Sequence, residues 1–250
     1  MRLGILGATG WLGGALAARL VAGGWPEARL VLANRSGPRG FPLAEWTDAA
    51  AVARADVVVV AVRPEDFPTP GFAPDGLVIS FATVWTLDKL RALAPRARIV
   101  RAMPNSGAPQ GASYTPWVGD VGPGDAELVM KLLSAMGEVV RLTSEDQLDY
   151  MAALPGSGMA YPALMAQAML THARAFGLPE AVAQRAVQAV VVQAASGLLG
   201  RMGDLDAVLD LYRGYRGVTA AGIAAAAPGM AQAMSAALEA AHAKAVDLGR

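Results

Sequence analysis

Glycines near the N-terminus follow a short apolar segment with the spacing of a phosphate-binding turn. Residues 3–6 (Leu-Gly-Ile-Leu) predict a strand, and Gly7-x-x-Gly10-x-x-Gly13 comes directly after it. Glycines at a strand-to-helix turn let the backbone approach a pyrophosphate, while the free N–H groups of the helix expected from Trp11 favour its negative charge. The first interval is one residue longer than in the usual G-x-G-x-x-G, so the loop geometry should differ slightly. The pattern predicts a dinucleotide site; the alternative is a turn that only packs a helix on a sheet.

The end of the next expected strand indicates which dinucleotide binds. Residues 29–33 lead into Asn34, Arg35 and Ser36. An acidic residue at this place accepts hydrogen bonds from the ribose 2′-hydroxyl of NAD, whereas these side chains offer donors and a cation suited to a 2′-phosphate. The sequence therefore predicts NADP(H) as the cofactor. A solvated Arg35 without a ligand is the alternative.

Composition excludes several other kinds of site. The 250 residues include 21 basic and 21 acidic side chains, so no net charge attracts nucleic acid or a membrane surface. Cysteine is absent, which excludes disulfides, thiolate nucleophiles and cysteine-bound zinc. His172 and His242 have no ligand-like neighbours, so no metal site is expected. The first strand begins too close to Met1 to leave room for a secretory signal, and we expect a cytoplasmic location.

The N-terminal part alternates apolar runs with helical patterns, which is typical of parallel strands joined by crossover helices. Strands are expected over residues 3–6, 29–33, 57–61, 77–80, 99–102 and 139–142, and helices over 12–22, 87–93 and 126–135. The apolar runs are continuous rather than alternating, as in strands covered by helices on both faces. We predict an α/β, Rossmann-type doubly wound sheet.

After Thr143 the pattern changes to helices alone. Ser144 with Gln147 three residues later is a capping box, which predicts a helix start. Further helices are expected over residues 159–176, 180–199, 206–212 and 230–248, separated by breaks at 177–179, 203–204 and Pro228-Gly229. We therefore expect two domains, an NADP-binding domain over 1–145 and an all-α domain over 146–250.

The C-terminal helices are unusually poor in charge. Residues 150–171 and 218–238 contain no Asp, Glu, Lys or Arg, and 54% of the whole chain is hydrophobic. Both stretches are long enough for membrane spans, but they contain proline, glycine and glutamine, and alanine supplies much of their apolar character. Packed helices are the better interpretation, and so much uncharged surface indicates cover by another subunit. We expect a homodimer or a higher homo-oligomer.

Four segments, taken in order, resemble the pyrroline-5-carboxylate reductase family. Residues 61–64 (Ala-Val-Arg-Pro) resemble its Ala-Val-Lys-Pro, and residues 101–106 its Arg-Val-Met-Pro-Asn-Thr. Residues 153–161 resemble its Ala-Leu-Ser-Gly-Ser-Gly-Pro-Ala-Tyr, and residues 214–222 its Ser-Pro-Gly-Gly-Thr-Thr loop with the helix that follows. The resemblance implies a Rossmann domain joined to a helical dimerisation domain, and NADPH-dependent reduction of 1-pyrroline-5-carboxylate to proline.

The resemblance also implies where the cofactor lies. Residues 61–64 would pass along it at the carboxyl ends of the strands, and Asn105 would lie near the nicotinamide. With the glycine turn, the expected cofactor-binding residues are Gly7, Ala8, Thr9, Gly10, Trp11, Leu12, Asn34, Arg35, Ser36, Ala61, Val62, Arg63, Pro64 and Asn105. Ordinary strand packing for residues 61–62 and a turn role for Asn105 are the alternatives.

The last segment departs from the family pattern. Tyr215 and Arg216 stand where the family has Pro-Gly, and Val218 replaces the first Thr. The resemblance implies that backbone N–H groups here hold the imino acid carboxylate while Thr219 approaches the imine nitrogen. The expected substrate-binding residues are Ser157, Arg216, Gly217, Val218 and Thr219, and the expected catalytic residues are Thr219 and Tyr161. Alternatively, Thr219 is a helix N-cap and Arg216 a surface cation.

Other functions also fit parts of this sequence. A reductase-like protein that binds NADP without turnover, or an imine reductase for another ring or side chain, would also fit the altered loop. A short-chain dehydrogenase is disfavoured because no Tyr has a Lys four residues later. A two-domain hydroxyacid dehydrogenase is disfavoured because Lys89, Lys131 and Lys244 all lie away from the expected interdomain helix.

Overall fold

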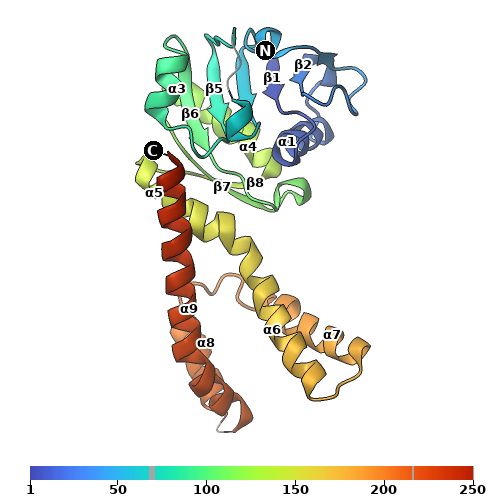
Figure 1. Ribbon diagram of the computed structural model, residues 1–250, viewed down its shortest axis with the longest axis vertical. Helices are drawn as coiled ribbons and strands as arrows, with labels where there is room; N and C mark the ends of the chain where they lie inside the picture. The colour runs from blue at the N-terminus through green and yellow to red at the C-terminus, as the bar shows by residue number, and fades with distance from the viewer. Residues whose placement is uncertain (68–70, 216, 250) are drawn as a thin grey trace. The chain divides into compact units, whose positions relative to one another are not determined.

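The computed structural model describes residues 1–67, 71–215 and 217–249. Its strands are β1 Leu3–Leu6, β2 Leu30–Ala33, β3 Glu45–Trp46, β4 Val57–Val60, β5 Leu77–Ser80, β6 Arg98–Ala102, β7 Ser113–Val118 and β8 Gly137–Arg141. They form one sheet in the order β3-β2-β1-β4-β5-β6-β7-β8 (Figure 1). Neighbours pair in parallel except β6 with β7, which pair antiparallel. The first six strands have the Rossmann order, whose switch point lies between β1 and β4.

Helices cover both faces of this sheet, as predicted. They are α1 Trp11–Ala22, α2 Ala49–Val52, α3 Leu87–Leu93, α4 Pro123–Leu133 and α5 Glu145–Met151. Alternate strand residues enter two separate cores: Val57 and Val59 pack with α1 and α4, while Val58 and Val60 pack with α2, α3 and α5. Side chains of a strand point to opposite faces in turn, so continuous apolar runs are required when both faces are buried.

Two strands of the sheet were missed by the sequence analysis. β3 has only two residues, too few for a pattern. β7 contains Pro116, and proline in a run argues against a strand because it donates no ladder hydrogen bond. The structure accommodates it because Pro116 acts as an acceptor: its carbonyl receives the N–H of Met103 at 2.9 Å. The β6–β7 register extends only over Arg101 with Val118 and Ala102 with Trp117.

The capping box at the start of α5 is confirmed. The Ser144 hydroxyl accepts the N–H of Gln147 at 3.3 Å. The Gln147 side-chain oxygen accepts the N–H of Thr143 at 3.0 Å, one residue before the capping position usually contacted. The two contacts satisfy backbone N–H groups between the end of β8 and the first turn of α5, where helical hydrogen bonds are not yet formed.

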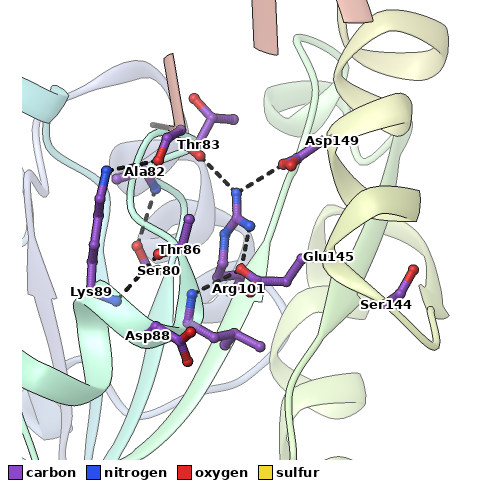
Figure 2. A network of polar contacts seen from close by, with 12 residues as sticks. Ser80, Ala82, Thr83, Thr86, Asp88, Lys89, Arg101, Ser144, Glu145 and Asp149 are labelled. Carbon is purple, nitrogen blue, oxygen red and sulfur yellow. Dashed lines mark hydrogen bonds and ion pairs between the residues drawn. The ribbon is translucent and has the colours of Figure 1, made fainter. Parts of the chain in front are cut away.

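A buried arginine fastens α5 to the sheet (Figure 2). Arg101 is 2% exposed at the end of β6, and its guanidinium pairs with Glu145 and, at 3.2 Å, with Asp149. It also donates to the Thr83 carbonyl at 2.7 Å, in the loop after β5. Glu145 accepts the N–H of Leu87 at 2.8 Å as well, which ties in the start of α3. Arg101 and its partner Glu145 together thus connect two strand ends and two helices.

Internal contacts divide the chain into two units, Met1–Gly156 with the last turns from Ala240 onward, and Ser157–Glu239. Within the first unit, the end of α9 (Val218–Gly249) packs on α5 and α3. The rings of Tyr150 and His242 pack edge to face with their centroids 5.6 Å apart, and the Lys89 ammonium donates to the Gly249 carbonyl at 2.7 Å. The expected boundary after residue 145 stays a prediction.

The second unit consists of helices: α6 Tyr161–Ala175, α7 Glu180–Gln188, α8 Leu205–Arg213 and most of α9. Arg174 and Glu180 join α6 to α7 with hydrogen bonds of 2.8 and 2.6 Å, which hold the pKa of the Glu180 carboxyl below its ordinary value. α9 is continuous, so the expected break at Pro228-Gly229 is wrong. The alanines around Pro228 are strong helix formers, which explains how the helix continues through it.

The helices of the second unit bury almost none of their apolar side chains. Among its described residues, only Ala183, Val187 and Val208 are buried hydrophobics. Phe176 and Leu199 are each 79% exposed. α9 is long and apolar enough to cross a membrane by length and composition, and none of its most apolar window is buried. An apolar surface of this extent requires a covering partner or an apolar medium.

Candidate active site

The glycine turn after β1 is built by close backbone contacts. Gly7 has a φ of +91°, and a Cβ on it would lie 2.5 Å from the Ala61 carbonyl oxygen. A Cβ on Gly13 would lie 2.4 Å from the Gly7 carbonyl oxygen. Only glycine fits at these two positions, because neighbouring backbone atoms occupy the space that a Cβ would need. Gly7 also has a positive φ, which residues with a side chain rarely adopt. The N-cap of α1 is Gly10, which has no side chain to cap the helix, so the first N–H groups of α1 remain available to an anion.

A cleft of about 850 Å³ opens at the switch point between β1 and β4. Pockets of this size suit small molecules and cofactors. Nine of the predicted cofactor residues line it: Gly7, Thr9, Gly10, Asn34, Arg35, Ser36, Ala61, Val62 and Arg63. Three separate segments of the sequence therefore contribute to one cavity at the carboxyl ends of the strands.

Polar side chains at the end of β2 are linked to the glycine turn. Asn34 donates to the Ser36 hydroxyl at 2.6 Å, and that hydroxyl lies 3.3 Å from the Thr9 hydroxyl. Arg35 is 83% exposed at its side chain, and its Nη1 lies 2.5 Å from Oδ1 of Asp66. The cleft therefore presents donors and a cation at the place that distinguishes NADP from NAD.

Of the other predicted cofactor residues, Ala8, Trp11, Leu12 and Asn105 lie outside the lining of this cleft. Ala8 is 1% exposed in the core, Leu12 packs against the same core, and Trp11 is 64% exposed at the start of α1. Pro64 begins a short 3₁₀ helix, Pro64–Asp66. The positions of Ala8 and Leu12 indicate that they support the turn through packing.

Asn105 is buried and makes the hydrogen bonds of a turn. Its side-chain oxygen accepts the N–H of Gly107 at 3.0 Å, and its side-chain amide donates to the Pro155 carbonyl at 3.2 Å. Its own N–H is bonded to the Ser113 hydroxyl at 3.0 Å. The turn role that the sequence also allows is therefore present, and contact with the nicotinamide stays a prediction.

Sequence reasoning missed part of the cleft. The additional lining residues are Leu6, Ala33, Thr47, Asp48, Ala49, Glu65, Asp66 and Phe67. Residues 47–49 follow β3, which was too short to predict, and Asp48 caps α2 by accepting the Ala51 N–H at 2.8 Å. Residues 65–67 follow Pro64 directly. Their place after the carboxyl end of a parallel strand was the signal that could have found them.

The residues expected to bind substrate belong to the second unit. Gly217 occupies the N-cap position of α9, because its carbonyl accepts the N–H of Ala221 at 3.0 Å. Thr219 therefore lies inside the first turn, and the alternative that it is the N-cap is wrong. Val218 is 92% exposed, and Arg216 lies outside the described residues. Tyr161 is the first residue of α6, and Ser157 begins the 3₁₀ turn Ser157–Ala160 that precedes it.

Comparison with known proteins agrees with this architecture. Residues 2–84 match the family described as NADP oxidoreductase, coenzyme F420-dependent, and residues 145–248 match pyrroline-5-carboxylate reductase dimerisation. The pyrroline-5-carboxylate reductase of Mycobacterium tuberculosis is 34% identical over 225 residues, covering 80% of this chain and 75% of that protein. That of Pseudomonas aeruginosa is 36% identical over 148 residues, so the match spans only 54% of that protein. The solved structure of the Coxiella burnetii reductase covers 100% of this chain and 98% of its own, with 27% identity and a TM-score of 0.84.

A Rossmann sheet with this cleft, followed by a helical unit, defines an NADP-dependent oxidoreductase of two parts. The identity and coverage of the relatives go further. The chain belongs to the pyrroline-5-carboxylate reductase family. The predicted fold class and the NADP(H) cofactor are confirmed, and the dimerisation match supports the expected homo-oligomer.

Proposed function

We propose that this chain reduces the C=N bond of 1-pyrroline-5-carboxylate with NADPH and so produces proline. The observation that carries the proposal is that both halves match in order: the N-terminal half has a cleft with NADP determinants, and the C-terminal half matches the family's dimerisation region. The relatives reported above are named pyrroline-5-carboxylate reductases, which supports the same reaction for this chain. We extend the proposal to a role in proline biosynthesis in the cytoplasm.

The residues of the cleft fit the cofactor. Gly7 lets the turn after β1 pack directly against the backbone of Ala61, and the uncapped start of α1 offers N–H groups to the pyrophosphate. Asn34, Arg35 and Ser36 would hold the 2′-phosphate through charge-assisted hydrogen bonds. When bound, the reduced nicotinamide supplies the hydride.

We assign the start of α9 to the substrate carboxylate. The first N–H groups of a helix have no partner within it, and those of Val218 and Thr219 are at this place. The Thr219 hydroxyl can donate to or accept from the imine nitrogen, and Tyr161 is the second candidate for this contact. Ser157 and Arg216 complete the proposed substrate-binding set.

The proposed reaction requires little acid–base catalysis from the chain. The imine carbon gains a hydride and the nitrogen gains a proton, and a cyclic imine can take that proton from water before it binds. The main task of the residues is then to orient the substrate. Well-oriented reactions gain about 7–11 kcal/mol from proximity alone.

The proposal is tested by following NADPH absorbance with the purified protein. The substrates are 1-pyrroline-5-carboxylate, the six-membered piperideine carboxylates and a blank without imine, each repeated with NADH. We expect turnover with the five-membered imine. Turnover restricted to another imine would replace the proposed substrate and assign the changes at Tyr215 and Val218 to specificity. Tight NADPH binding without any turnover would refute the proposed reaction.

A further inference from the structure

We propose that Asp66 is a specificity-determining residue that lowers the preference of the cleft for NADPH over NADH. The inference rests on the proposed function, because it concerns the same cofactor cleft. It starts from one contact: Oδ1 of Asp66 lies 2.5 Å from Nη1 of Arg35, the cation expected to bind the 2′-phosphate. No sequence pattern at the end of β2 pointed to this carboxylate.

The pair is formed by two loops that meet in the cleft. Arg35 follows β2, Asp66 closes the 3₁₀ turn after β4, and both line the same cavity. The N–H of Asp66 donates to the Arg63 carbonyl at 3.0 Å, which fixes the backbone that carries the carboxylate. Asp66 is 31% exposed at its side chain, whereas Arg35 is 83% exposed. The less exposed carboxylate therefore holds the more exposed guanidinium in place.

The other charged groups of the lining have different partners. The Asp48 carboxylate accepts the N–H of Ala51, and Glu65 lies 4.0 Å from Arg63. Among the described residues that line the cleft, Asp66 is thus the carboxylate paired with Arg35. A 2′-phosphate would have to share Arg35 with this carboxylate and would be repelled by its charge.

The same carboxylate suits the other cofactor. A ribose 2′-hydroxyl carries no charge, and an acidic side chain is the usual acceptor for it in NAD sites. In most Rossmann sites that acceptor stands at the end of the second strand, where this chain has Asn34 and Arg35. Here Asp66 supplies it from the loop after β4. The Arg35–Asp66 pair therefore provides a donor for NADPH and an acceptor for NADH at one place.

The test compares cofactor affinity in the full-length protein without imine. Asp66→Asn keeps the side-chain shape and removes the charge, and binding of NADPH and NADH is measured by titrating the cofactor fluorescence at low salt. We expect Asp66→Asn to bind NADPH about threefold more tightly than the wild type, because an exposed ion pair of this strength no longer competes with the 2′-phosphate for Arg35. NADH should bind equally well or more weakly. The gain should shrink in high salt because the charges are screened. Asp66→Ser, which also removes the charge, should shift the preference in the same direction.

The matched control is Asp75→Asn. Asp75 also pairs with an exposed arginine, Arg96 at 2.8 Å, but neither residue lines the cleft, so the affinity ratio should equal that of the wild type. An unchanged ratio of NADPH to NADH affinity in both Asp66 variants would overturn the inference while leaving the proposed function intact. Failure of the wild type to bind either cofactor would instead refute the proposed function, and the inference with it.

Discussion

A Cβ atom on Gly7 would lie 2.5 Å from the carbonyl oxygen of Ala61, where β1 and β4 end side by side. Gly7→Ala must therefore displace the backbone in the middle of the cleft. We expect the variant to lose NADPH binding and to unfold at a lower temperature. A residue with a side chain in this conformation also costs about 1–2 kcal/mol by itself.

The control for Gly7→Ala is Gly24→Ala. Gly24 has the same φ of +91°, but a Cβ there would meet nothing within 4 Å. Thermal unfolding of both variants separates backbone strain from close approach, and a cofactor titration reports on the cleft. Normal NADPH affinity in Gly7→Ala would contradict the assignment of this turn to the cofactor.

Arg35→Ala tests the choice of cofactor. A hydrogen bond to a charged group contributes about 1.5–3 kcal/mol, so NADPH binding should weaken by that amount. NADH lacks the phosphate, and its affinity should stay close to that of the wild type. Equal losses for the two cofactors, measured by fluorescence titration, would show that Arg35 does not recognise the 2′-phosphate. Arg96→Ala, outside the cleft, serves as the control.

Thr219→Ala tests the proposed contact with the imine. Thr219 lies in the first turn of α9 and not at its N-cap, so its hydroxyl is dispensable for the helix start. We expect turnover to fall about tenfold, the value of one hydrogen bond made in the transition state, with NADPH affinity unchanged. Thr219→Ser should restore most of the activity. A lower unfolding temperature with normal turnover would indicate a structural role instead.

Arg101→Met tests the buried ion-pair network. Methionine fills much of the space but leaves Glu145 and Asp149 without their cation. Breaking a buried pair costs about 3–5 kcal/mol, and since these carboxylates are 22–28% exposed we expect about 2–4 kcal/mol of lost unfolding free energy. Arg96→Met breaks an exposed pair and should cost at most about 1 kcal/mol. Similar losses in chemical denaturation of the two variants would refute the structural importance of the network.

The apolar surface of the second unit predicts that the protein is a homo-oligomer in solution. With Phe176 and Leu199 each 79% exposed and few buried residues, the helices require a covering partner. Light scattering of the purified protein should give at least twice the monomer mass without detergent. A monomer that is stable in plain buffer would contradict the homo-oligomer.

The sequence was most informative where local chemistry determines the structure. The apolar runs of β1, β4 and β5, the glycine turn and the Ser144 cap follow from short-range rules, and the structure has each of them. Arg35 was identified because it lies in the polar segment Asn34-Arg35-Ser36 that follows a predicted strand. These features depend on few residues that are close together in the chain.

The remainder depends on contacts between distant segments. Pro116 argued against a strand, and only the partners β6 and β8 show how it is accommodated. Pro228 argued for a helix break that the neighbouring alanines prevent. Asp66 lies 31 residues after Arg35 in the sequence, and the two meet in the cleft only through the fold. No local sequence pattern spans such a separation.

The most direct measurement is the fate of the hydride. The purified protein is incubated with 1-pyrroline-5-carboxylate and NADPH that carries deuterium at the transferable position, and the product is analysed by mass spectrometry. We predict proline with one deuterium, located on the carbon that was doubly bonded to nitrogen. Absence of labelled proline, with the protein folded and NADPH bound, would contradict the assignment of this chain as a pyrroline-5-carboxylate reductase.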